Sequence, residues 1–222
     1  MKLGVVTLYT NNIKEYGILS ATNKRKYSEK HGYACIVGKK ILDTNRAAAW
    51  SKIMMIKKLL RSYDWIFWTD ADSLIMNMNV NLEDLIHKHL NKDTILTKGV
   101  SSPINTGQWL IKNSKWSHEL LDKIWCDTPG CFLKNNPWEQ GSLVSLLSEK
   151  TKAKMAILDH RVMNSIPNIR YIDLDCSPKL NRRKAIKMEY KNGDFIVHFM
   201  FSKNYSKRVA GMKYYSRKVT EK

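Results

Sequence analysis

The sequence is poor in cysteine, long apolar runs and acidic residues, and each shortage excludes a class of protein. Only four of its 222 residues are cysteine, and no two have the Cys-x-x-Cys spacing of a metal-binding pair. Cys126 and Cys131 lie five residues apart and are open either to pairing or to staying reduced. No apolar run approaches the roughly 18 residues of a membrane-spanning helix, and the apolar start at residues 3–6 is too short for a signal peptide. We therefore expect a soluble protein of a reducing compartment, cytoplasmic or peripheral to a membrane.

Acidic residues are also scarce, because 20 Asp and Glu face 38 Lys and Arg, which gives a formal net charge of +18. Such a balance favours polyanions, anionic membrane surfaces or phosphorylated ligands, and it does not choose among them. We expect mostly solvated basic faces, with contact to a membrane surface or a polyanion as the alternative. The basic residues cluster early and late, at Lys24, Arg25, Lys26 and Lys30, and at Lys179, Arg182, Arg183, Lys184, Lys187 and Lys191.

The chain has no internal repeat, low-complexity block or linker. Hydrophobic residues make up 43%, so we expect one domain over residues 1–205 and a basic tail over residues 206–222. Hydrophobic periodicity predicts helices over residues 16–30, 47–63, 82–90 and 115–125, and from 136 to about 148. Strands are predicted over residues 3–8, 33–37, 65–69, 94–97, 105–112, 155–158, 169–172 and 195–199. This order predicts an α/β fold with a central, mostly parallel sheet flanked by helices.

The most informative chemistry lies where the strand at residues 65–69 ends, because this apolar run leads directly into Asp70-Ala71-Asp72. In an open α/β sheet, ligands bind just beyond the carboxyl ends of the strands. A carboxylate pair there suits Mg²⁺ or Mn²⁺, which prefer carboxylate and phosphate oxygens. The pattern predicts a metal site that holds a phosphorylated substrate. A second Asp-x-Asp, Asp173-Leu174-Asp175, runs into Cys176-Ser177-Pro178 and indicates a strand end and turn with a structural role.

Seven short stretches then follow one another along the chain: Tyr27-Ser28-Glu29-Lys30-His31-Gly32-Tyr33, Trp50-Ser51-Lys52, Trp68-Thr69-Asp70-Ala71-Asp72, Asn105-Thr106-Gly107-Gln108-Trp109-Leu110-Ile111-Lys112-Asn113 followed by Trp116, Glu139-Gln140-Gly141-Ser142-Leu143, Arg161-Val162-Met163-Asn164-Ser165-Ile166-Pro167, and His198-Phe199. With these stretches in this order, the chain resembles a GT-A nucleotide-sugar glycosyltransferase. More narrowly, it resembles the family of yeast α-galactosyltransferases and plant xyloglucan xylosyltransferases, glycosyltransferase family 34. The similarity covers about residues 3–203.

The chain also departs from that family's pattern. Met200 and Phe201 stand where the family often has Gly-Cys, and we expect no N-terminal membrane anchor of the kind that the family's Golgi members carry. A compact, Lys-rich sequence of this kind resembles a soluble bacterial or viral relative. For such a relative, the expected cytoplasmic location includes a host cytoplasm.

The resemblance implies a Rossmann-like GT-A fold and a set of metal ligands. Asp70, Asp72 and His198 would hold Mn²⁺ or Mg²⁺ against the donor diphosphate, and an imidazole beside two carboxylates suits Mn²⁺ better. Taken alone, His198 in its apolar strand also fits a buried core histidine. Lys203 would lie near the diphosphate and stabilise the leaving group, with a surface lysine as the alternative.

The same resemblance implies contacts for the rest of the donor. Thr7 and Tyr9 would contact the ribose and base, with Tyr9 stacking on uracil. The other implied donor contacts are Lys52, Ala71, Asn105, Thr106 and Gly107. Glu139 and Gln140 would face the transferred sugar and act in catalysis, although Glu139 also fits the acid of a helix-capping box that starts at Asn136.

We therefore expect an enzyme that moves a sugar from a UDP-linked donor to a hydroxyl of a glycan or glycoprotein acceptor. The resemblance implies retention of configuration, which needs a carboxylate nucleophile or same-face attack in which the departing phosphate takes the acceptor proton. Glu139 is the candidate nucleophile, and we favour same-face attack. One alternative is a haloacid-dehalogenase-type phosphatase, whose motif Asp70-Ala71-Asp72-Ser73 fits locally. The other is a basic protein that binds a membrane surface or nucleic acid, although no nucleic-acid-binding signature is present and we expect no specific nucleic-acid partner.

Overall fold

The structure is a computed structural model that describes residues 1–176 and 180–220. At its centre lies a six-stranded sheet with the order β2-β1-β3-β6-β5-β7. Only β6 runs against its neighbours β3 and β5, so the mostly parallel sheet predicted from the sequence is confirmed. The strands are β1 (Leu3–Leu8), β2 (Ala34–Gly38), β3 (Trp65–Thr69), β5 (Thr94–Thr97), β6 (Asn105–Lys112) and β7 (Met155–Leu158).

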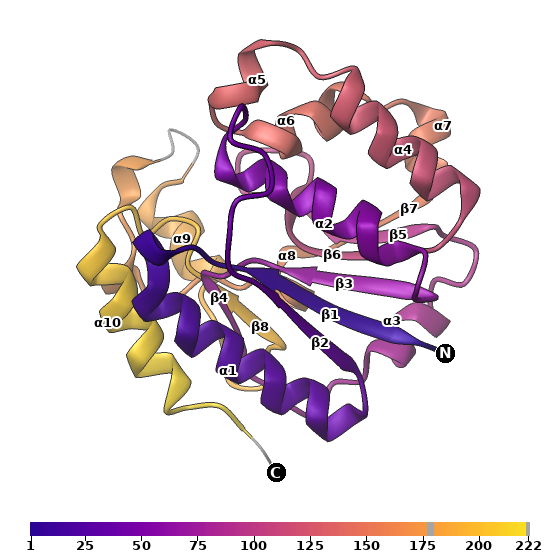
Figure 1. Cartoon of the computed structure of the whole chain (residues 1–222). Helices are drawn as coiled ribbons and strands as arrows, with labels where there is room; N and C mark the ends of the chain where they lie inside the picture. The colour runs from indigo at the N-terminus through magenta and orange to yellow at the C-terminus, as the bar shows by residue number, and fades with distance from the viewer. Residues whose placement is uncertain (177–179, 221–222) are drawn as a thin grey trace.

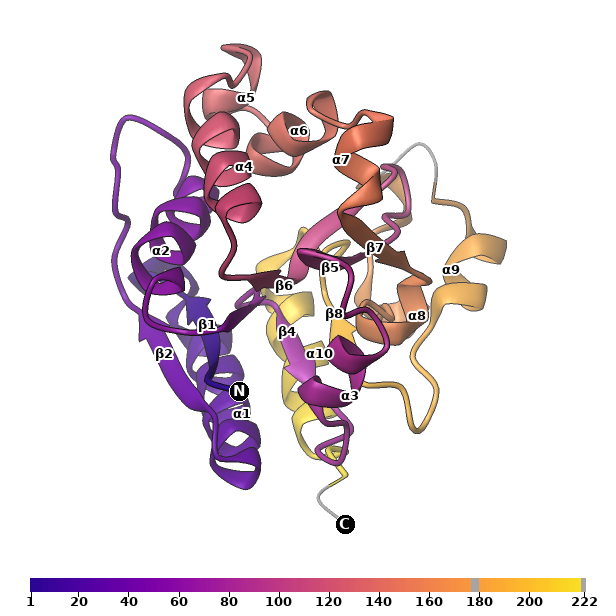
Figure 2. The same cartoon turned by 90° about the vertical axis from the view of Figure 1, so that its right-hand side faces the viewer.

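Helices cover both faces of this sheet, because alternate side chains of each strand point to opposite sides (Figures 1 and 2). Val6 and Trp68 pack into a core with the apolar faces of α2 and α4. Val5 and Phe67 pack on the other side against α3 and a small antiparallel sheet of β4 and β8. The elements of these layers are α1 (Lys14–His31), α2 (Ser51–Leu60), β4 (Ser73–Ile75), α3 (Leu82–His87), α4 (Lys115–Cys126) and β8 (Ile196–His198).

The remaining elements are short, except for the 12-residue α10. Their bounds are α5 (Cys131–Lys134), α6 (Trp138–Ser145), α7 (Glu149–Ala153), α8 (His160–Met163), α9 (Arg182–Met188) and α10 (Tyr205–Ser216), with 3₁₀ turns at Asn11–Ile13, Ala48–Trp50, Ile169–Tyr171 and Leu174–Cys176. The strand predicted at residues 169–172 was wrong, since the side chain of Asn168 caps a 3₁₀ turn there by accepting from the N–H of Arg170.

The last helix differs most from expectation. Where the sequence suggested a basic tail after residue 205, α10 packs beside α1 (Figure 1). Val209, Met212 and Tyr215 are buried, at the three-residue spacing that puts side chains on one helix face. The basic residues between them hid this apolar stripe in the composition. Residues 221–222 lie outside the described part of the chain.

Candidate functional site

The turn after β3 places the two aspartates. The N–H of Asp70 donates to the carbonyl oxygen of Gly107 (2.8 Å), so β3 stays paired with β6 up to the first aspartate. The N–H of Ser73 then donates to the carbonyl oxygen of Asp70 (3.2 Å) and closes a turn from which β4 starts. The side chains of Asp70 and Asp72 are 28% and 18% exposed, so both carboxylates are reachable from solvent.

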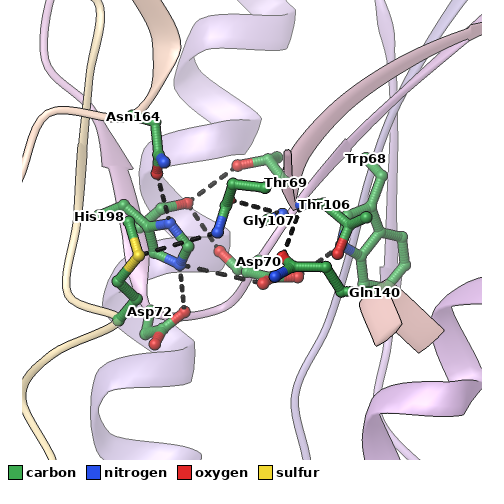
Figure 3. Close-up of polar contacts among 12 residues, drawn as sticks. Trp68, Thr69, Asp70, Asp72, Thr106, Gly107, Gln140, Asn164 and His198 are labelled. Carbon is green, nitrogen blue, oxygen red and sulfur yellow. Dashed lines mark hydrogen bonds and ion pairs between the residues drawn. The ribbon is translucent and has the colours of Figure 1, made fainter. Parts of the chain in front are cut away.

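A histidine from far along the sequence reaches the same place, because β8 pairs with β4 in a register that sets His198 opposite Ser73. Its Nε2 lies 3.2 Å from Oδ1 of Asp72 and 3.9 Å from Oδ2 of Asp70 (Figure 3). One ligand atom from each of these three residues lies within 4.8 Å of the other two. The residues predicted from the resemblance as metal ligands are therefore brought together.

The second nitrogen of this histidine is also fixed. Nδ1 of His198 lies 2.8 Å from Oδ1 of Asn164, a buried amide oxygen that can only accept a hydrogen bond. Nδ1 therefore carries hydrogen, and Nε2 faces the two carboxylates, where it can hold a proton or bind a metal ion. Three lone-pair donors that face one another need a proton or a metal cation between them, so the group fits a divalent metal.

Gly107 makes room for this cluster. A Cβ atom at this position would come closer than 3.0 Å to Cε1 of His198 and would lie 3.0 Å from Oδ2 of Asp70. The backbone N–H of Gly107 is held by Oδ1 of Asn105 (2.9 Å). A residue without a side chain thus lets β6 run directly beneath two of the three candidate ligands.

Lys52 connects the aspartates to the residues expected to face the sugar. Its Nζ lies 3.2 Å from Oδ1 of Asp70 and 2.6 Å from Oε1 of Glu139. The hydroxyl of Thr106 donates to the same Glu139 oxygen (3.1 Å), and the Thr106 N–H donates to Oε1 of Gln140 (3.1 Å). Burial alone would lower the pKa of Lys52, but Asp70 and Glu139 raise it above its ordinary value, so the ammonium stays charged.

Glu139 does not cap a helix, which the sequence had left open. Helix α6 has Pro137 at its N-cap position and no side-chain capping bond there. Glu139 is 4% exposed and turns inward to Lys52 instead. Its second oxygen, Oε2, is buried and has no hydrogen-bond partner among the described residues. The carboxylate is therefore held by one oxygen only.

Sequence reasoning missed Arg208, because it lies in the segment expected to be a tail. Nη1 of Arg208, on α10, lies 3.5 Å from Oδ2 of Asp72 and donates to the hydroxyl of Tyr16 (3.1 Å). Burial would raise the pKa of Asp72, but His198 and Arg208 hold it well below its ordinary value. The three-residue apolar spacing within α10 was the signal that could have placed this arginine.

These groups line one cavity of about 850 Å³. Arg208, Trp68 and Trp138 also line it. The residues singled out from the sequence that line it are Lys52, Asp70, Ala71, Asp72, Asn105, Thr106, Gly107, Glu139, Gln140, His198 and Lys203.

Thr7 and Tyr9 are the two expected donor contacts that the structure does not bring to the cavity. Both are buried, and Tyr9 packs against Gly17 of α1. Leu8 and Thr10 line the cavity instead. Neighbouring residues of an extended chain point to opposite sides, which explains why Leu8 and Thr10 reach this cavity and Thr7 and Tyr9 do not.

The second Asp-x-Asp makes contacts of a structural kind. Asp173 accepts hydrogen bonds from Nζ of Lys207 and from the N–H of Asn204 (3.1 Å), and so fixes the start of α10. Asp175 lies in the 3₁₀ turn that follows. Ser177, Pro178 and Lys179 lie outside the described residues.

Comparison with known proteins assigns the chain to a family. The sequence profile of the galactosyl transferase GMA12/MNN10 family matches residues 5–103 and 87–207, which together span most of the chain. The chain belongs to the galactosyl transferase GMA12/MNN10 family. The resemblance noted from short motifs is thereby confirmed, and Arg208 lies just beyond the segment that the family profile matches.

Relatives within this family share moderate identity with the chain. It is 27% identical to the probable α-1,6-mannosyltransferase MNN10 of Saccharomyces cerevisiae, over 92% of this chain and 61% of the relative. It is 30% identical to xyloglucan 6-xylosyltransferase 1 of Arabidopsis thaliana, over 48% of this chain and 25% of that protein. The chain thus spans less than two thirds of the length of these curated relatives.

Solved structures share the fold. A glycosyltransferase involved in glycosylation of the major capsid of PBCV-1 superposes with a TM-score of 0.72 at 18% identity, covering 96% of this chain and 100% of that one. The galactosyltransferase LgtC, solved with donor and acceptor sugar analogues, gives a TM-score of 0.61 at 12% identity, covering 99% and 97%. The GT-A fold predicted from the sequence is confirmed. Among the described helices, none combines the length and apolar character needed to cross a bilayer.

Proposed function

We propose that this chain is a metal-dependent glycosyltransferase that transfers a sugar, with retention, from a UDP-sugar to a hydroxyl of a glycan or glycoprotein. One observation carries the proposal: Asp70, Asp72 and His198 converge at the carboxyl end of β3 on the wall of a cavity of about 850 Å³. Ligands of open α/β sheets bind at this edge. Membership of the family supports the same reaction class.

The candidate ligands fit a divalent cation in charge, geometry and support. Two carboxylates and an imidazole suit Mn²⁺, and Mg²⁺ less well. The imidazole is oriented by Asn164, as metal-bound histidines usually are by a second polar group. When bound, the ion would neutralise charge on the departing nucleoside diphosphate. Asp70, Asp72 and His198 are the residues that would hold it.

Positive side chains around these ligands suit a diphosphate. Arg208 and Lys203 line the same cavity as the acidic pair, and Lys203 is exposed. A cation near the phosphate that leaves stabilises the charge that develops there. Leu8, the last residue of β1, and Thr10 and Ile13 after it also line the cavity, and there we place the nucleobase and ribose. The choice of uridine rests on the family resemblance.

The arrangement around Glu139 favours same-face attack over a covalent intermediate. Its Oε1 is held by Lys52 and Thr106, and Gln140 is held by the Thr106 N–H. A carboxylate paired with a buried ammonium is a weak nucleophile, but it can stabilise positive charge that develops on the sugar. In same-face attack the sugar–phosphate bond breaks as the acceptor oxygen bonds to the same face of the sugar. The acceptor proton passes to the departing phosphate oxygen.

The covalent route is tested by Glu139→Gln, which keeps the shape of the side chain and removes its negative charge. A variant with nearly intact turnover would eliminate Glu139 as a nucleophile. Complete loss of turnover, together with a trapped glycosyl-enzyme in the wild type, would contradict same-face attack.

The proposed donor site is tested by thermal stability with UDP and Mn²⁺, alone and together, for the wild type and Asp72→Ala. A ligand that binds only the native state raises the melting temperature, so we expect a rise that needs both ligands. Asp72→Ala should lose that rise. No shift with any nucleoside diphosphate and metal would reject the transferase, and phosphate release from an aryl phosphate would favour the phosphatase alternative.

We also propose peripheral contact with an anionic membrane through α9. Arg182, Arg183 and Lys187 are exposed on this helix, and Ile186 between them is 52% exposed. Basic side chains beside an exposed apolar one suit the surface of an acidic bilayer. Cosedimentation with phosphatidylserine vesicles, but not with phosphatidylcholine vesicles, is expected. Binding to neither kind of vesicle, or equal binding to both kinds, would contradict the proposed membrane contact.

A further inference from the structure

Helix α1 buries a stripe of polar side chains. Ser20, Asn23 and Lys24 lie on one face at three- and four-residue spacing, and none is more than 7% exposed. Asn23 binds the backbone of β4 twice, because its amide donates to the carbonyl oxygen of Ile75 and accepts from the Ile75 N–H, both at 2.8 Å. The first long helix is therefore attached to the strand after the Asp pair by polar contacts.

Lys24 lies at the centre of this stripe and is fully buried. Its Nζ donates to the carbonyl oxygens of Asp70 (2.9 Å) and Ser73 (3.0 Å) and to the hydroxyl of Ser20. An ammonium has three hydrogens to donate, and each of these has a partner. Its partners are neutral oxygens rather than a carboxylate, and burying a charge without an opposite charge in direct contact is costly.

The Lys24 ammonium lies where it can hold the turn that carries the two aspartates. Asp70 and Ser73 are the first and last residues of the turn that carries both acidic ligands, and one ammonium binds the carbonyl oxygens of both. Two carboxylates that face one site repel each other, and a cation beneath them offsets that repulsion. Burial lowers the pKa of Lys24 to about 7, although the Asp70 and Asp72 carboxylates favour its charged form.

We propose that Lys24 is a positioning residue of the metal site: it fixes the Asp70–Ser73 turn and offsets carboxylate repulsion before a divalent cation binds. This inference rests on the proposed function. Lys24 does not line the cavity. It acts through the backbone of Asp70 and through its charge. The early basic cluster was expected to be a solvated face, and for Lys24 that expectation was wrong.

Asn23 supplies a matched control on the same helix. It attaches α1 to β4 as Lys24 does, but its hydrogen bonds go to Ile75 rather than to Asp70 or Ser73. If Lys24 served only to attach the helix, replacing either residue would lower stability, and the two variants would have the same metal affinity. If Lys24 positions the Asp pair, the two variants will differ in metal affinity.

The experiment compares Lys24→Met with Asn23→Ala, using free Mn²⁺ measured by electron paramagnetic resonance in the absence of nucleotide. Thermal unfolding is followed in parallel. Removing a positive charge near the carboxylates would by itself favour a divalent cation, but we expect the loss of the fixed Asp70–Ser73 turn to dominate. Lys24→Met should therefore weaken Mn²⁺ binding at least about tenfold, the size of effect seen when groups that orient ligands are removed. Asn23→Ala should bind Mn²⁺ like the wild type although its melting temperature falls. Equal affinities, or equal losses, in the two variants would overturn the inference.

Two further variants control for misfolding and for Mn²⁺ that binds elsewhere. Lys24→Gln retains a hydrogen-bond donor without the charge, and it replaces Lys24→Met if that protein does not fold. Asp72→Ala reports whether Mn²⁺ binds at the proposed site. A wild type that binds no Mn²⁺ would reject the proposed function and this inference with it. Binding that is lost in Asp72→Ala but kept in the Lys24 variants would reject the inference alone.

Discussion

The substitution Gly107→Ala adds one methyl group at the most crowded point of the site. The new Cβ would lie closer than 3.0 Å to Cε1 of His198 and 2.9 Å from Oδ1 of Asn105, separations that real Cβ atoms essentially never show. The backbone of Gly107 is not in the left-handed region, so the cost is steric alone. Relief requires the His198 ring to move by roughly 1 Å, because overpacked cores shift their side chains and backbone.

A movement of that size would separate Nε2 of His198 from Asp72, which now lies 3.2 Å away. We expect Mn²⁺ affinity to fall at least about tenfold, as when ligand orientation is lost. Overpacking should also cost about 1–3 kcal/mol of the free energy of unfolding. For a domain of this size, that lowers the melting temperature by roughly 2–12 °C.

The assay is a Mn²⁺ titration by calorimetry together with a scanning-calorimetry melt, with Gly130→Ala as the matched control. A Cβ at Gly130 meets nothing within 4 Å, so this variant should keep wild-type Mn²⁺ affinity and stability within about 0.5 kcal/mol. Wild-type Mn²⁺ affinity in Gly107→Ala would refute the placement of His198 among the ligands. An equal loss in Gly130→Ala would show that the effect is not local.

Three other changes test the surrounding structure. Asn164→Ala removes the acceptor that orients His198 and should weaken Mn²⁺ binding about 10–100-fold in calorimetric titration, whereas an unchanged affinity would contradict that role. Arg208→Met removes a cation beside Asp72, so Mn²⁺ should bind more tightly without nucleotide while UDP binds less tightly with Mn²⁺ present; weakening of both in the same titrations would indicate only structural damage. Met212→Ala empties a fully buried position on α10 and should cost about 2–5 kcal/mol in urea unfolding, a loss that a frayed tail would not show.

The sequence was sufficient for features that are local. An apolar run that ends in Asp70-Ala71-Asp72 predicts a buried strand and an acidic edge, and the structure has β3 there with the residues expected. The Asn105–Lys112 strand was also predicted with its bounds. These features depend on residues within a few positions of one another, so a pattern along the chain is enough to find them.

Several features made by distant partners were missed. The three-residue strand β4 is defined by pairing with β8, which comes more than 100 residues later. Lys24 looked like part of a solvated basic cluster, because no sequence pattern shows that its ammonium ends under Asp70. Helix α1 buries polar rather than apolar side chains on that face, so hydrophobic periodicity carries little information there.

The wide sequence separation within the site has a consequence for how the molecule folds. Asp72 meets a histidine 126 residues away, and Tyr16 meets Arg208 across 192 residues. Closing such long loops costs the chain much conformational entropy before the contacts contribute favourable energy, so these contacts tend to form late. A chain whose sheet has formed but whose last segments have not docked would display the acidic pair without its third ligand. Under the proposed function, a divalent ion would then bind tightly only to fully folded molecules and would stabilise them over partly folded ones.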